Sequence, residues 1–319
     1  MSFLDILAIL VTGTLYTSAP IIFTALGGVF SERSGVVNIG LEGLMLFGAF
    51  IGVVTNLLMG DTWGTMTPWN ALLFAAIGSG LFALLHAVAS ITFRADQVVS
   101  GVAINFLSLG LTVFAIKKIF DKGQTDFIQY RIEKIDIPGL SDIPVLGKIF
   151  FSNVPITSYI AIILAFVVWY VIYKTPFGLR LRAVGEHPMA ADTMGINVYK
   201  MRYIGVCISG VFAGIGGAIF AMSISNNFSG ATITGQGFLA LAAMIFGKWN
   251  PLGALGAALF FGFAQSLSVT GGTIPVLDQI PSVLLTILPY IFTILALVGF
   301  VGRSEAPKAL GTPYEKGKR

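Results

Sequence analysis

The most unusual polar side chain of the sequence is Glu42, which lies inside a long apolar segment. Ser34 and Asn38 precede it at intervals of four residues, so on a helix the three side chains form one polar stripe. A carboxylate in a membrane helix costs roughly 2.5–3.5 kcal/mol on insertion scales, so it is expected to face a bundle interior or a water-filled path. Two roles fit the stripe: a buried network that ties helices together, and the lining of a translocation path.

A second polar stripe lies at residues 101–112. Gly101, Asn105, Ser108 and Thr112 are spaced by four, three and four residues, which keeps them on one face of a helix. Small and polar side chains can line a path, and they also hold membrane helices together. The sequence leaves both interpretations open.

Charged residues stand next to the first stripe. Glu32 and Arg33 come directly before it, at the mouth of the apolar segment. Because charged groups avoid the bilayer core unless they are paired, we expect these two residues to form or join an ion pair at the inner mouth.

Residues 185–195 predict a short helix between two apolar segments. Pro188 suits the first helical position, and Gly195 suits the position just after the helix ends. A helix of about two turns is not stable in water by itself, so we expect a partner surface to hold it. The alternative is a surface helix packed on its own membrane domain. The predicted docking segment consists of Gly185, Glu186, Pro188, Met189, Ala190, Ala191 and Gly195.

Catalytic patterns are missing from the sequence. It contains no GxxxxGK[ST] phosphate-binding loop, one cysteine (Cys207), and two histidines (His86 and His187) that lie far apart. These residues support neither a cysteine-based metal site nor a Ser-His-Asp arrangement. We therefore expect a protein without a metal or cofactor of its own that does not hydrolyse ATP by itself.

The elements that position these residues are apolar helices. Of the 319 residues, 55% are hydrophobic and 11% are charged, and mean hydropathy is +0.87. Soluble proteins carry roughly 25% charged residues. We expect an all-α, polytopic transmembrane bundle of about nine to ten helices, in which 237–247 is too short to cross as a regular helix. The apolar segments are 5–30, 35–58, 70–93, 97–120, 157–173, 203–222, 237–247, 251–270 and 282–302.

The positive charges predict the orientation of the bundle. Thirteen of the nineteen Lys and Arg residues fall in loop 174–202, in the tail 303–319, and in short turns at Arg33, Arg94 and Lys248. Cytoplasmic loops are enriched in Lys and Arg, so we assign these segments to the cytoplasm, with the N-terminus and loop 121–156 outside. Residues 1–302 form the predicted membrane domain, and residues 303–319 form a basic cytoplasmic tail. The same bias explains the net charge of +4 without nucleic-acid binding.

Four blocks of the sequence resemble a known family. Together they are similar to permeases of ATP-binding-cassette (ABC) importers of the branched-chain amino acid, simple-sugar and nucleoside type, with the greatest likeness to bacterial nucleoside permeases. The blocks are Ser31–Gly43 with its continuation to Phe50, Asp96–Gly101 with Asn105, Pro176–Glu186, and Gly247–Gly253.

This resemblance implies a multi-pass subunit of a bacterial cytoplasmic membrane complex. A second homologous permease, ABC ATPase subunits that bind the ATP, and an extracellular solute-binding lipoprotein are the implied partners. Nucleosides are the implied substrate, and ribose-like sugars are the alternative. In such importers a cytoplasmic coupling helix carries an EAA-like pattern ending in Gly; Ala190, Ala191 and Gly195 keep that spacing, while Met189 stands in place of Glu.

Two other functions compete with this interpretation. An ion-coupled secondary transporter usually needs ion-coordinating groups deep in the membrane, and Glu42 is the one clear candidate in the sequence. A membrane-embedded enzyme lacks a recognisable catalytic set here. ATP-driven import is therefore the favoured function.

Overall fold

The computed structural model describes residues 3–271, 284, 287, 291–292, 294 and 306–317. In this part of the chain the long elements are helices, and the strands are two residues each. The elements are α1 (Phe3–Arg33), α2 (Leu41–Trp63), η1 (Gly64–Met66), α3 (Thr67–Ala87), η2 (Val88–Thr92), α4 (Gln97–Phe120), β1 (Lys134–Ile135), η3 (Gly147–Phe151), β2 (Val154–Pro155), α5 (Ile156–Lys174), α6 (Pro176–Glu186), α7 (Pro188–Thr193), α8 (Val198–Phe220), η4 (Ala221–Ser225), α9 (Gln236–Phe246) and α10 (Pro251–Thr270).

The predicted all-α polytopic bundle is confirmed. Within the described residues, six apolar helical runs are long enough to cross a membrane, and one of them, Leu41–Thr92, holds both α2 and α3. These two helices are antiparallel: the Thr67 hydroxyl at the start of α3 donates to the Gly60 carbonyl near the end of α2 (3.4 Å), and the Ser79 hydroxyl farther along α3 donates to the Leu44 carbonyl near the start of α2 (3.0 Å). The segment predicted at 282–302 lies outside the described residues, apart from single positions.

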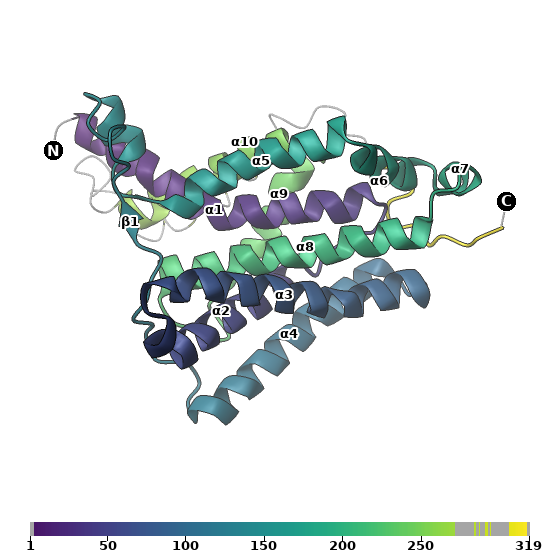
Figure 1. Ribbon diagram of the computed structural model, residues 1–319, viewed down its shortest axis with the longest axis horizontal. Coiled ribbons are helices and arrows are strands. Elements are labelled where there is room, and N and C mark those ends of the chain that lie inside the picture. Colours follow the sequence, from purple (N-terminus) through teal and green to yellow (C-terminus); the bar gives the residue numbers. More distant parts are fainter. Residues whose placement is uncertain are drawn as a thin grey trace.

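Helix α8 runs through the middle of the bundle, and small residues allow its close packing. It contacts α1, α2 and α3 along much of its length (Figure 1). A Cβ added at Gly217 would lie 1.9 Å from the Met45 carbonyl oxygen, and one at Gly48 would lie 2.4 Å from the Gly214 Cα. Only glycine permits these backbones to approach so closely, as is common in membrane helix pairs.

The two ends of the bundle differ in structure. At one end, called here the β1 end, lie the N-terminus and the segment 121–155, where β1 and β2 pair antiparallel with Ile135 opposite Val154 (Figure 1). At the other, the α7 end, lie α6, α7 and the tail residues 306–317. Helix α4 starts near the α7 end and diverges from α3 toward the β1 end.

Helix α9 is the short helix that the sequence predicted. Its 11 residues rise about 16 Å at 1.5 Å per residue, about half of a hydrocarbon core of about 30 Å. A tight turn follows, and the Asn250 side chain accepts the Leu252 N–H (2.9 Å) to begin α10 with Pro251 in its first turn. Helices α9 and α10 pack together, so α9 reaches only part of the way back into the bundle.

Candidate functional site

Glu42 closes the N-terminus of α9. It lies in the first turn of α2, and its carboxylate accepts the backbone N–H groups of Gly235 (2.5 Å), Gly237 (2.6 Å) and Phe238 (3.3 Å). The first N–H groups of a helix lack partners within the helix and carry partial positive charge, so a carboxylate is well matched to them. A Cβ on Gly237 would lie 2.5 Å from the Glu42 Cα, so glycine is required for this approach.

The chain that leads to α9 is not helical and runs beside the middle of α4. A Cβ on Gly230 would touch Val113 and Leu109 of α4, and Gly235, at φ +86°, already meets Glu42. Non-helical backbone at membrane depth is tolerated where it is buried in protein or lines a water-filled cavity. Ala231 and Thr234 of this segment are exposed in the single chain. The exposed surface of this segment is therefore suited to contact with protein or water, and not with lipid.

The polar stripe on α4 faces α2, as one of the two interpretations expected. Asn105 donates to the Ile39 carbonyl (3.1 Å) and accepts the Gly43 N–H (2.7 Å), and the Ser108 hydroxyl donates to the Gly43 carbonyl (2.7 Å). The buried Thr112 hydroxyl bonds to the Ser108 carbonyl of its own helix (2.8 Å). These bonds fix α4 beside the turn that carries Glu42.

The prediction of one helical stripe through Ser34, Asn38 and Glu42 was wrong. Helix α1 ends at Arg33 and α2 begins at Leu41, so residues 34–40 form a non-helical connection. Ser34 donates to the Ser31 carbonyl (2.6 Å), and Asn38 donates to the Ser209 hydroxyl of α8 (2.6 Å). Both side chains are fully buried and hold the connection, whereas the half-buried Glu42 bonds to α9.

Two residues that the sequence patterns did not single out also hold this connection. His86 Nε2 donates to the Val37 carbonyl (2.9 Å), which leaves Nδ1 to accept from the Ser100 hydroxyl (2.9 Å). The Gln97 side-chain oxygen accepts the Val37 N–H (2.7 Å). Both backbone groups of one connection residue are thus bonded to α3 and α4. No spacing in the sequence indicated these contacts, because the partners lie in separate segments.

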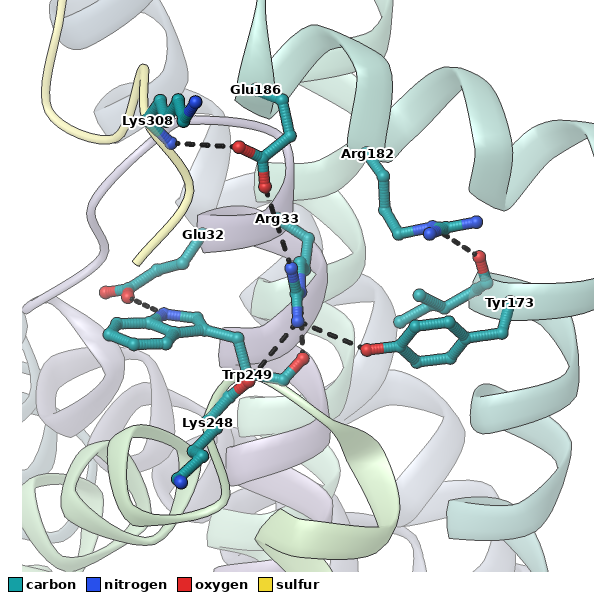
Figure 2. A network of polar contacts seen from close by, with 9 residues as sticks. Glu32, Arg33, Tyr173, Arg182, Glu186, Lys248, Trp249 and Lys308 are labelled. Atoms are coloured by element: carbon teal, nitrogen blue, oxygen red, sulfur yellow. Dashed lines mark hydrogen bonds and ion pairs between the residues drawn. The ribbon is translucent and has the colours of Figure 1, made fainter. Parts of the chain in front are cut away.

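Arg33 joins several segments at the α7 end (Figure 2). Its guanidinium donates to the carbonyls of Trp249 (2.9 Å) and Lys248 (3.2 Å) and to the Tyr173 hydroxyl (3.1 Å), and it lies 3.9 Å from the Glu186 carboxylate. Lys248 and Trp249 are consecutive non-glycine residues at positive φ (+56° and +53°), a conformation that costs of order 1–3 kcal/mol per residue. Arg33 stabilises this strained turn by binding both of its carbonyls.

Glu32 has a different partner from the one expected. Its carboxylate accepts the indole N–H of Trp249 at 2.5 Å, and the side chain is buried (Figure 2). Arg33 therefore joins an ion pair with Glu186, while Glu32 is satisfied by a neutral donor. The sequence indicated charged groups at this position but could not reveal Trp249, which lies 217 residues away.

The predicted short helix is present as α7, Pro188–Thr193, with Gly195 at φ +81° after its end. Gly185 and Glu186, however, belong to the preceding helix α6. Ala191 is buried against the chain itself, so a partner cannot contact it directly in this conformation. Ala190 is exposed, and so are the large side chains Met189 (39%) and Met194 (82%). Two large apolar side chains are therefore exposed at α7 and directly after it.

Comparisons with known proteins agree with this architecture. Residues 10–297 match the family described as branched-chain amino acid transport system, permease component. The guanosine ABC transporter permease protein NupQ of Bacillus subtilis is 63% identical over 319 residues, covering 100% of both chains. The nucleoside ABC transporter permease protein NupC of Lactococcus lactis subsp. cremoris is 52% identical over 318 residues, again covering 100% of both. The guanosine ABC transporter permease protein NupP of Bacillus subtilis is 27% identical over 310 residues, covering 95% of this chain and 84% of that protein. The chain therefore belongs to the branched-chain amino acid transport system permease family.

Proposed function

We propose that this chain is a permease subunit of an ABC importer that carries nucleosides across the cytoplasmic membrane, with ATP hydrolysed by a separate subunit. The observation that carries the proposal is the identity of 63% and 52% with two nucleoside-type permeases over their whole length. In this proposal the chain itself forms part of the translocation path and a docking surface for the ATPase, and the ATPase subunit binds and hydrolyses ATP.

The path runs along the face formed by residues 229–238, Glu42 and the half-buried Asn105. Support comes from the non-helical backbone beside the middle of α4 and from the partly exposed carboxylate, neither of which suits a lipid-facing surface. A second, homologous permease is the partner that covers this face. The similarity to both NupQ and NupP, two permease proteins of one organism, supports a pair of different permeases.

The other predicted path residues have a supporting role in this proposal. Ser34, Asn38, Ser108 and Thr112 are fully buried and hydrogen-bonded within the single chain. They hold α2 and α4 in place around Glu42, and they do not contact the solute in this conformation.

The α7 end faces the cytoplasm in this proposal, and the β1 end faces outward, where the solute-binding lipoprotein delivers the substrate. The charge bias supports this orientation, because α6, α7 and the tail lie at the α7 end, and contacts with Glu186 and Glu315 place Arg33, its acceptor Lys248 and Arg94 there as well. On that side, the exposed Met189 of α7 and Met194 directly after it provide the apolar surface that docks the ATPase. Short, exposed apolar helices are stabilised by such a partner.

The experiment is uptake of labelled nucleoside into vesicles that contain the whole complex, with ATP but without an ion gradient. A Met189→Arg variant is expected to lose ATPase binding and uptake. Leu140→Arg is the matched control, because Leu140 is equally exposed (42%) but lies at the β1 end. Excess ribose tests the sugar alternative. Uptake that needs an ion gradient, or that ribose alone abolishes, contradicts the proposed function.

A further inference from the structure

The C-terminal tail is bound to the α7 end of the bundle, although the sequence indicated only a basic cytoplasmic segment. Residues 306–317 contain no helix or strand, and they lie across the ends of other elements (Figure 1). The Ala309 N–H donates to the Gly185 carbonyl at the end of α6 (2.9 Å), and the Gly311 N–H donates to the Gly35 carbonyl in connection 34–40 (3.3 Å). The tail thereby links two segments that lie far apart in the sequence.

The tail continues over the start of α8. Arg202 is 1% exposed, and its guanidinium donates to the Thr312 carbonyl (2.9 Å); its Nε and Nη2 groups have no partner among the described residues. Tyr199 donates to the Tyr314 carbonyl (3.3 Å), and the two rings lie 5.3 Å apart. A buried guanidinium needs an acceptor, so the tail satisfies a charge that the bundle leaves incompletely paired.

Further contacts connect the tail with α6 and with the connection before α4. The Lys308 N–H donates to the Glu186 carboxylate (3.3 Å), which also faces Arg33 (Figure 2). Glu315 pairs with Arg94 (3.3 Å) in the connection between η2 and α4. The buried Ala309 and Tyr314 show that the tail packs against the bundle as well as bonding to it.

We propose that residues 306–317 act as a strap that ties the α6–α7 segment to the α1–α2 connection, so that movement of α7 is transmitted to Glu42. The proposal rests on the proposed function, in which an ATPase moves α7. The strap binds Gly185, three residues before α7, and Gly35, seven residues before Glu42. Connection 34–40 leads from Gly35 to the turn that carries Glu42, and its Val37 is also held to α3 and α4, so a displacement at Gly35 reaches Glu42 together with the ends of these two helices.

The test uses a backbone change that leaves the charge and length of the tail unaltered. Gly311 has φ +77°, so Gly311→Val strains the docked conformation. Gly317→Val is the matched control: Gly317 has φ +84° with no atom within 4 Å of an added Cβ, and none of the contacts above involves it. Docking is measured by thiol labelling of Ala309→Cys in a Cys207→Ser background, where the cysteine replaces a residue that is 8% exposed.

We expect Gly311→Val to raise the labelling rate by about tenfold or more, because the rate follows the population of the released tail. It should also lower nucleoside uptake per ATP hydrolysed, while Gly317→Val changes neither. A chain ending at Ser304 should lose uptake and regain it with an added peptide of residues 305–317, but not with a scrambled peptide.

Two results overturn the strap. One is rapid labelling of the Ala309→Cys variant without the glycine change, which shows that the tail is not docked. The other is unchanged uptake per ATP when the tail is released. Failure of the complex to use ATP at all refutes the proposed function and the transmission role together, whereas the labelling experiment still reports docking.

Discussion

Replacement of Glu42 by leucine tests whether this carboxylate places α9. The change leaves the N–H groups of Gly235 and Gly237 without an acceptor, at about 1–3 kcal/mol each. Loss of the negative charge at the N-terminus of α9 removes about 0.3–1 kcal/mol more. The opposing effect is relief of the roughly 2.5–3.5 kcal/mol insertion cost of a carboxylate, of which only part applies to a partly buried, hydrogen-bonded group. The two orphaned donors and the lost charge cost roughly 2–7 kcal/mol together, so with about half of the insertion cost relieved the net destabilisation is about 1–5 kcal/mol.

Glutamine gives an intermediate result. Its carbonyl oxygen can still accept one N–H, but its NH₂ group faces the other, so one charge-assisted bond is lost at about 1–2 kcal/mol. The variants are compared by thermal unfolding in detergent, by ATP-driven uptake, and by thiol labelling of Ala240→Cys, a fully buried position in α9, in a Cys207→Ser background. We expect labelling and loss of uptake to increase from Glu42 to Gln to Leu.

The control for this series lies at the other end of α2. Asn56 is 2% exposed and donates to the Tyr130 carbonyl (2.6 Å), so Asn56→Leu also removes a buried polar contact. It should lower thermal stability without changing labelling at position 240. Wild-type stability, labelling and uptake in Glu42→Leu would refute the argument that this carboxylate fixes α9.

Two further predictions concern packing and orientation. Gly217→Val should lower the free energy of unfolding by more than the usual cost of overpacking, about 1–3 kcal/mol, because its Cβ would overlap a carbonyl of α2. Thermal unfolding measures the effect, and Gly256→Val is the control because no atom lies within 4 Å of a Cβ added there. Single cysteines at Thr193 and Gln129, in a chain without Cys207, should differ in intact cells: an impermeant thiol reagent should label position 129 and not 193. Equal loss of stability in the two glycine variants, or the reverse labelling pattern, contradicts these predictions.

Helix positions could be predicted closely from the sequence, because apolar segments and their caps are local features. The segments 97–120 and 251–270 coincide with α4 and α10, and Pro188 and Gly195 bracket α7 as expected. The break at 34–40 was missed. The spacing of Ser34, Asn38 and Glu42 matched a helical period by coincidence, while Gly35 at φ +92° ends α1 and no proline marks the break.

Contacts between distant segments could not be predicted. The first partner of Glu42 lies 193 residues later in the chain, and the indole that bonds to Glu32 lies 217 residues away. Ala191 is buried because of the way α7 packs against neighbouring segments, and the sequence pattern of a two-turn helix does not determine that packing. Docking of the tail could not be predicted either, because each of its hydrogen bonds described above uses a backbone group of the tail, which leaves no signal in the sequence.

The contact between Glu42 and α9 also requires a particular order of steps while the protein is synthesised and inserted into the membrane. Helix α9 is too short to be recognised as a spanning segment by itself, and the group that binds its first turn is made 193 residues before Gly235. The nascent chain must therefore keep this carboxylate accessible in the membrane until α9 and α10 emerge and enter together. We therefore expect a defect at Glu42 to impair insertion of α9 and α10 before it affects transport.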